Sequence, residues 1–457
     1  MSDTVIILLS ILVCFVAAKL YKRSAGSLKF TQINMISFIF YFDLIIFSYL
    51  GSIVILLFTN AEFNNLIDNI FGGEATKILV WECISYAIIA IAVGMMIANA
   101  FFNFNAKEIE RYHAKPIQSL FSPHDSYVKI PLYFLSVICI LSVLYTFISI
   151  GTIPLIKSFS ISDPNDVLAM RAAADRDFSG NVYIKNFFGL LLTPILCYIS
   201  YCYYLMDKSL KNKLWFYIMF FFAFLILTYD ASKSPFVRFL TGFIFLRILM
   251  TGKISFKRFF WLFLLMILLL MVIYMVIAKQ DIMTIFFSYN SGITGRILVG
   301  QVSSLYQHFE IFPSDHAFLG FSSISKVLPL SHYSDRSGRI VLEITTPGFA
   351  EVGGVYNTLF LGEAYANFGW LGVILSPLWI GFLIQTLHII LLRLPKSPLF
   401  IGLFVFFSYT SNITGGINEY IYNIQYLLLV ITFIAVWVAA FLLHRSSSRF
   451  PKLQHAV

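Results

Sequence analysis

Residues 288–318 read SYNSGITGRILVGQVSSLYQHFEIFPSDHAF, and residues 332–369 read HYSDRSGRIVLEITTPGFAEVGGVYNTLFLGEAYANFG. Both belong to a polar stretch, residues 279–369, that separates two long apolar segments. Connections this long are uncommon and are usually functional when they are rich in ionisable groups. We therefore predict that this stretch is the working part of the molecule. Its ionisable side chains are Arg296, His308, His316, Arg336, Arg339, Glu343, Glu351 and Glu363.

The rest of the chain is strongly apolar. Hydrophobic residues make up 59% of the 457 residues and charged residues 12%, and the mean hydropathy is +0.83. A soluble protein of this size does not carry that much apolar surface. The composition predicts an all-α polytopic membrane protein with a single transmembrane domain over residues 1–457.

Apolar windows of about twenty residues, the length that crosses a bilayer as a helix, recur along the chain. We expect about eleven transmembrane helices. Their predicted ranges are Val5–Leu20, Met35–Phe58, Ile78–Phe102, Ile130–Ile150, Phe187–Met206, Leu214–Thr228, Pro235–Met250, Phe259–Ala278, Leu371–Leu392, Leu399–Thr414 and Ile421–Leu443.

Basic clusters follow every odd-numbered predicted helix, for example Lys22 and Arg23 after the first and Arg445 and Arg449 after the last. Because basic loops stay in the cytoplasm, we expect the N-terminus outside and the C-terminus in the cytoplasm. The net charge of +9 then reflects topology, and we expect no nucleic-acid partner.

Two further outer segments carry charge. The loop 151–186 contains SDPNDVLAMRAAADRDFSG at residues 162–180, which predicts a short amphipathic helix that begins near Asp163 and Pro164. It carries Arg171 and Arg176. The hairpin TYDASKSPF at residues 228–236 places Lys233 at the outer mouth of two short helices.

Five arginines lie in segments that we predict to be outside, where the positive-inside bias makes basic residues scarce. They are Arg171, Arg176, Arg296, Arg336 and Arg339. Arginine suits phosphate because its planar fork donates two parallel hydrogen bonds and keeps its charge. We predict that these arginines and Lys233 bind an anionic, phosphate-bearing substrate. The alternative is local pairing with acidic neighbours, which are Asp175, Asp177, Asp335 and Glu343.

A general base is needed if a sugar hydroxyl attacks at this site. The candidates are His316, His308, Glu343, Glu351 and Glu363, with His316 ranked first. His308 stands on an expected helix, GRILVGQVSSLYQHF, which begins at Gly295. No metal-binding or nucleotide-binding motif is recognisable, so neither a metal ion nor a cofactor is expected.

The segment GEAYANFGWLGV, residues 362–373, enters the ninth predicted helix. Its glycines suit close helix packing. A carboxylate such as Glu363 near the hydrocarbon indicates a partner or a function.

Four features together resemble the O-antigen and capsule polymerases of the Wzy family. They are GTIPLI, the arginine-bearing LAMRAAADRDFSG, the GRILVG helix and, above all, GEAYANFGWLGV. The resemblance covers the chain from about the fourth predicted helix onward. Arg171 and Arg296 match the family's outer-loop arginines, and Glu363 to Gly369 match its Glu, Tyr, Asn-Phe-Gly signature. The chain departs from the family because its two loops share no common arginine motif.

The resemblance implies a GT-C-like glycosyltransferase of the bacterial inner membrane with a periplasmic active face. Such enzymes transfer a growing glycan from undecaprenyl diphosphate to the non-reducing end of a new lipid-linked repeat unit. The expected partners are undecaprenyl-diphosphate-linked oligosaccharide, membrane lipid and a chain-length regulator protein.

Three alternatives remain open. An O-antigen ligase would use the same donor, and a flippase-type transporter could use Asp43 and Glu82 as proton sites. A non-enzymatic scaffold could recruit partners through the outer loop.

Overall fold

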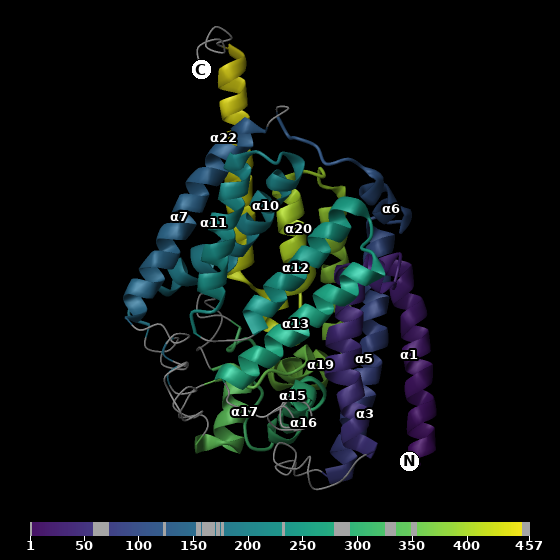
Figure 1. The fold of residues 1–457 in the computed structure, drawn as a ribbon. Helices are drawn as coiled ribbons and strands as arrows, with labels where there is room; N and C mark the ends of the chain where they lie inside the picture. The colour runs from purple at the N-terminus through teal and green to yellow at the C-terminus, as the bar shows by residue number, and fades with distance from the viewer. Residues whose placement is uncertain are drawn as a thin grey trace.

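The computed structural model describes residues 2–57, 73–121, 125–151, 157, 170, 174, 178–230, 234–277, 293–324, 335–348 and 354–449. All the elements in these ranges are helices (Figure 1). The first half contains α1 (Asp3–Ala25), η1 (Phe30–Gln32), α2 (Met35–Phe38), η2 (Ile39–Tyr49), α3 (Leu50–Leu57), α5 (Gly73–Phe101), α6 (Lys107–Ala114), α7 (Ser126–Ile150), η4 (Ile184–Leu192), α10 (Thr193–Met206) and α11 (Leu210–Leu227). The second half contains α12 (Ser234–Thr251), α13 (Phe256–Ile277), α15 (Ile293–Leu298), α16 (Ser303–Ile311), α17 (Ser337–Thr345), α19 (Phe360–Arg393), α20 (Pro398–Thr410), α21 (Asn418–Ile421) and α22 (Ile424–Arg449).

Each of the eleven predicted transmembrane segments lies largely within helical structure. Among the described residues, eight helical segments are long and apolar enough to cross a membrane, as a polytopic membrane protein requires. They are Asp3–Gln32, Met35–Leu57, Gly73–Phe101, Ser126–Ile150, Ile184–Met206, Leu210–Leu227, Phe360–Arg393 and Asn418–Ser446. The count of eleven and the orientation of the chain remain predictions.

The polar helices gather at one end of the bundle. Figure 1 shows α15, α16 and α17 at the end where the chain begins, while α6 and the end of α22 lie at the opposite end. Basic residues mark that opposite end. There Arg393 forms an ion pair with Glu108 (2.9 Å), and Lys396 donates to the backbone carbonyls of His113 and Met250 at 3.1 and 3.3 Å. The basic side chains of Arg393 and Lys396 therefore lie at the end of the bundle opposite to α15, α16 and α17.

Helices α5 and α19 pack closely along their length. A Cβ on Gly94 would overlap the backbone carbonyl of Leu378, and a Cβ on Gly381 would overlap that of Ile91. Each helix thus presents a glycine to the backbone of the other, which is the arrangement that lets membrane helices approach most closely.

Helix α19 is broken at Gly369, whose φ of 58° and ψ of −142° are not helical. The short first half, which carries Glu363 and Asn367, turns at this glycine into the long apolar second half. Gly372 sits against the carbonyl of Ala364, so a Cβ there would overlap it. The backbone N–H groups of Leu319 and Gly320 donate to the carbonyls of Ala366 and Asn367 at 2.9 and 2.8 Å, which satisfies the end of the short half.

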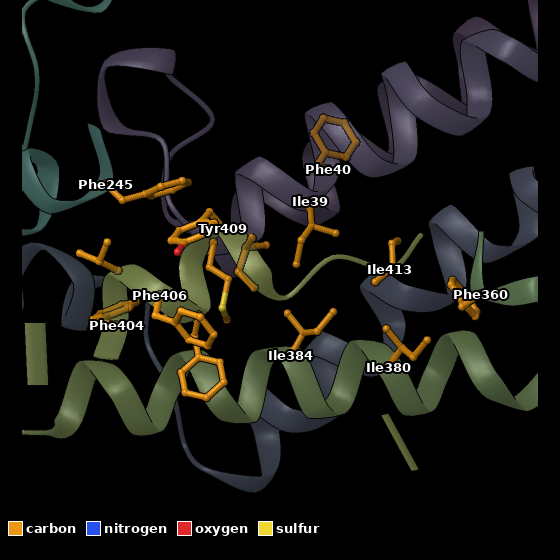
Figure 2. Close-up of a cluster of buried hydrophobic side chains, with 14 of the residues drawn as sticks. Ile39, Phe40, Phe245, Phe360, Ile380, Ile384, Phe404, Phe406, Tyr409 and Ile413 are labelled. Atoms are coloured by element: carbon orange, nitrogen blue, oxygen red, sulfur yellow. The ribbon is translucent and has the colours of Figure 1, made fainter. Parts of the chain in front are cut away.

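A buried apolar cluster joins α19 to the segment that follows α20. Figure 2 shows Ile380 and Ile384 of α19 facing Ile413, with Ile39 of η2 and Tyr409 of α20 nearby. All five side chains belong to the continuous buried core. This packing fixes the chain after α20 against the long half of α19.

Candidate functional site

The site is built around residues 411–423 between α20 and α22, which we call the irregular segment because its backbone is non-helical apart from the single turn α21. Helix α20 has 13 residues and is therefore about 20 Å long, too short to cross the roughly 30 Å hydrocarbon core. The predicted tenth helix was expected to run to Thr414, but α20 ends at Thr410. Irregular backbone inside a membrane bundle must be satisfied by protein or line a cavity, and this segment does both.

Its first half is held by the bundle. The buried carboxylate of Asp43 accepts a hydrogen bond from the backbone N–H of Ile413 at 3.1 Å, and the N–H of Phe360 donates to the carbonyl of Ile413 at 2.8 Å. Asp43 stands in η2, a π-helical stretch of the Met35–Leu57 segment, and π-helical geometry is frequent at functional sites. The buried carboxylate therefore positions the irregular segment.

Its second half is held by Arg336, at the start of α17. The guanidinium donates from Nε and Nη2 to the two oxygens of Glu363 (2.8 and 3.2 Å), from Nη1 to Glu419 (3.0 Å) and from Nη2 to the carbonyl of Gly415 (2.8 Å). These bonds use four of its five N–H donors. Burial alone would lower the pKa of Arg336, but the hydrogen bonds and charges of Glu363 and Glu419 raise it above its usual range. Arg336 thus joins α17, α19 and the irregular segment.

An amide network completes this arrangement. The backbone N–H of Asn418 donates to Glu363 (2.9 Å), and the side chain of Asn418 accepts from Asn367 (2.9 Å) and donates to the carbonyl of Ser323 (3.0 Å). The hydroxyl of Ser323 donates to the side-chain oxygen of Asn367 at 2.9 Å. All four side chains are buried. We call Arg336, Glu363, Asn367, Asn418 and Ser323 the polar cluster.

His308 lies beside this cluster and is fully buried. Its Nδ1 lies 2.6 Å from the carbonyl of Ser304, so Nδ1 carries the proton, and Nε2 then accepts from the hydroxyl of Ser337 at 3.0 Å. Burial lowers the pKa of His308 to about 4, against a smaller opposing effect of the Ser304 hydrogen bond. The imidazole is therefore neutral and fixed in one tautomer. The helix expected to begin at Gly295 is two helices, α15 and α16, separated by a turn at residues 299–302.

The other predicted site residues do not belong to the polar cluster. Arg339 pairs with Glu343 one turn along α17 (2.6 Å), as the local-pairing alternative expects. His316 is half-buried, and its Nδ1 lies 2.8 Å from the carbonyl of Ala317. Arg296 belongs to α15 but its side chain lies outside the described residues, as do Arg171, Arg176, Lys233 and Glu351. Of the segment 162–180, where a surface helix is expected, the structure describes residues 170, 174 and 178–180.

A cavity of about 820 Å³ opens next to the irregular segment. Its apolar wall comes from η4, α19 and α20, with Leu191, Leu383, Leu387 and Phe406 among its residues. Its polar part contains Arg238 of α12 together with the side chains of Tyr409, Asn412, Glu419 and Asn423. Through Glu419 and Gly415 the cavity reaches the polar cluster. A cavity of this size, lined by apolar side chains together with a cation, an anion and several amides, suits an amphiphilic ligand.

The two acids considered as proton sites differ in their surroundings. Asp43 is buried against Ile413, whereas Glu82 is exposed and borders a separate pocket of about 240 Å³ with Tyr86 and Trp370. Asp43 therefore belongs to the site around the irregular segment, and Glu82 borders a different pocket.

Sequence reasoning missed Arg238, Asn418, Glu419 and the glycines Gly415 and Gly416. Arg238 could have been found as a charge inside a predicted transmembrane helix, which indicates function by default. The sequence SNITGGINE at residues 411–419 interrupts two apolar segments with glycine and asparagine, a signal for broken helix. Comparison with protein-family models, curated proteins and solved structures finds no match for this chain.

Proposed function

We propose that this chain is a membrane glycosyltransferase that polymerises lipid-linked oligosaccharide repeat units. The donor is a glycan on undecaprenyl diphosphate, and the acceptor is the non-reducing end of a new repeat unit on the same carrier. The observation that carries the proposal is the cavity, whose lining combines apolar residues with Arg238 and polar groups and so suits the two parts of a prenyl diphosphate. Only part of a long prenyl chain fits inside, and the rest lies in the bilayer.

The resemblance to the Wzy family supports the same reaction, since its best-matching segment supplies Glu363 and Asn367 to the polar cluster. On this proposal the protein belongs to a bacterial inner membrane, and the end with α15, α16 and α17 faces the periplasm. The chain would take a GT-C-like fold and act with a chain-length regulator.

The reaction balances without a metal ion. A hydroxyl of the acceptor sugar attacks the anomeric carbon of the donor glycan, and the bond from that carbon to the diphosphate oxygen breaks. Undecaprenyl diphosphate leaves as the anion, and a general base takes the hydroxyl proton. Cationic side chains stabilise the charge that develops on the leaving diphosphate.

Two candidate bases are constrained by their surroundings. His308 is held neutral but is buried away from the cavity lining, so it would have to move before it could touch an acceptor. His316 is partly exposed and remains the preferred candidate, with Glu343, Glu351 and Glu363 behind it.

The test uses purified protein and a synthetic lipid-linked repeat unit, with no other protein present. A ladder of products that differ by one repeat unit supports the proposal. A single transfer product that forms only when lipid A core is added would instead identify a ligase. Movement of unaltered lipid-linked unit across proteoliposomes would identify a transporter.

A further inference from the structure

The charge balance of the cavity centres on one arginine. Among the described residues that line it, Arg238 is the single cation and Glu419 the single anion. Glu419 is already paired, because it accepts from Arg336 (3.0 Å) and from the side-chain amide of Asn423 (2.6 Å). The charge left uncompensated on the cavity surface is therefore positive, and it belongs to Arg238.

Arg238 stands one turn inside α12, after Pro235, and its side chain is exposed to the cavity. Within the described ranges it makes no hydrogen bond or ion pair, unlike Arg336, which has used four donors. A guanidinium keeps its charge in surroundings of low polarity and offers a fork of donors that matches phosphate oxygens. Such a group in a membrane cavity indicates an anionic ligand.

The surroundings of Arg238 favour this role. The carboxylate of Asp43 interacts with it electrostatically, but Asp43 is not among the residues that line the cavity. On the cavity side, Tyr409, Asn412 and Asn423 line the same space and can donate hydrogen bonds to further oxygens. The same cavity is lined by apolar residues of α19 and α20.

We propose that Arg238 binds the diphosphate of the prenyl carrier from inside the bundle. This assignment rests on the proposed function for the identity of the carrier. Arg336 then has a different task, which is to hold Glu419 and Gly415 so that the cavity wall keeps its shape.

The test measures binding of farnesyl diphosphate to the purified full-length protein in detergent. Arg238→Gln should weaken binding about tenfold or more, because a charged hydrogen-bond donor is lost. Arg247→Gln is the matched control. It removes the same residue type from the same helix, nine positions later and therefore on the opposite face, and it does not line the cavity. The control should bind like the wild type, and both variants should keep the wild-type unfolding midpoint.

Competitors define the ligand. Farnesol and inorganic diphosphate should each displace farnesyl diphosphate weakly, since each supplies half of the recognition. Equal displacement by phosphatidylglycerol would mark a general anionic-lipid site and overturn the inference.

The inference and the proposed function fail in different ways. If Arg238→Gln binds farnesyl diphosphate as tightly as the wild type while the wild type still forms polymer, Arg238 is the wrong residue and the function stands. If binding depends on Arg238 but the wild type never extends a lipid-linked unit, the site stands and the polymerase proposal fails. A wild type that binds no farnesyl diphosphate at all would remove the basis for the site.

Discussion

Gly416 offers a sharp test of how the irregular segment packs. Its φ is +104°, and a Cβ placed on it would overlap an oxygen of Glu363 and come within 2.8 Å of Nη2 of Arg336. Gly416→Ala should therefore strain the backbone and separate the ion pair. The first effect costs about 1–3 kcal/mol, and losing one charged hydrogen bond costs about 1.5–3 kcal/mol.

Together these effects remove about 3–5 kcal/mol from the free energy of unfolding, with allowance for partial relaxation. For a chain of 457 residues the midpoint moves by about 1 °C per kcal/mol, so the midpoint of thermal unfolding in detergent should fall by about 3–5 °C. Polymer formation should fall with it, because Glu419 and the cavity wall shift.

Gly415→Ala is the control, since it changes the neighbouring residue in the same way. Gly415 has no positive φ, and its added Cβ would meet only the side-chain oxygen of Asn412 at 3.3 Å, which can move by a few tenths of an ångström. Its carbonyl still accepts from Arg336. Equal midpoints for the two variants, with equal activity, would refute the packing described for Gly416.

Three further predictions concern topology, substrate binding and pH. In a cysteine-free background, cysteines at Ser179 and Ser314 should react with an impermeant maleimide from outside and one at Ser446 should not; the reverse pattern would invert the proposed orientation. Arg296→Ala should abolish polymer at normal protein levels and Arg296→Lys should rescue it only in part, so full rescue in the polymer assay would argue against bidentate binding. Because burial lowers the pKa of His308 to about 4, the unfolded chain binds that proton first as pH falls. Stability should drop between about pH 6.5 and pH 4 by up to about 3 kcal/mol, and His308→Gln should flatten that slope in unfolding midpoints; an unchanged slope would exclude His308 as its source.

The helical segments could be predicted because twenty-residue apolar windows leave little alternative in a bilayer. The break at Gly369 could not be predicted. The glycines Gly362, Gly369 and Gly372 look alike in sequence, and only Gly369 takes a non-helical conformation. Packing decides which one, through the close contact between Gly372 and Ala364.

The candidate site was partly visible in the sequence. Glu363 was expected to have a partner, and Arg336 fills that place. The sequence does not identify Arg336 as this partner, because Arg336 stands 27 positions from Glu363 and 83 positions from Glu419 in the chain. Burial of His308 was missed for a similar reason: Ser304 and Ser337 satisfy its polar atoms, so a polar stretch of sequence folds into the interior.

The reciprocal glycine contacts between α5 and α19 bear on how a lipid could enter. Those contacts leave no gap through which α19 could slide or tilt away from α5, because any separation would open empty space along two backbones. Leu383 and Leu387, which belong to α19 and line the cavity, therefore keep a fixed position. If the proposed carrier enters this cavity, the helices that move to admit its prenyl tail are then among the others that line it, such as η4, α12 and α22, while α19 keeps its place against α5.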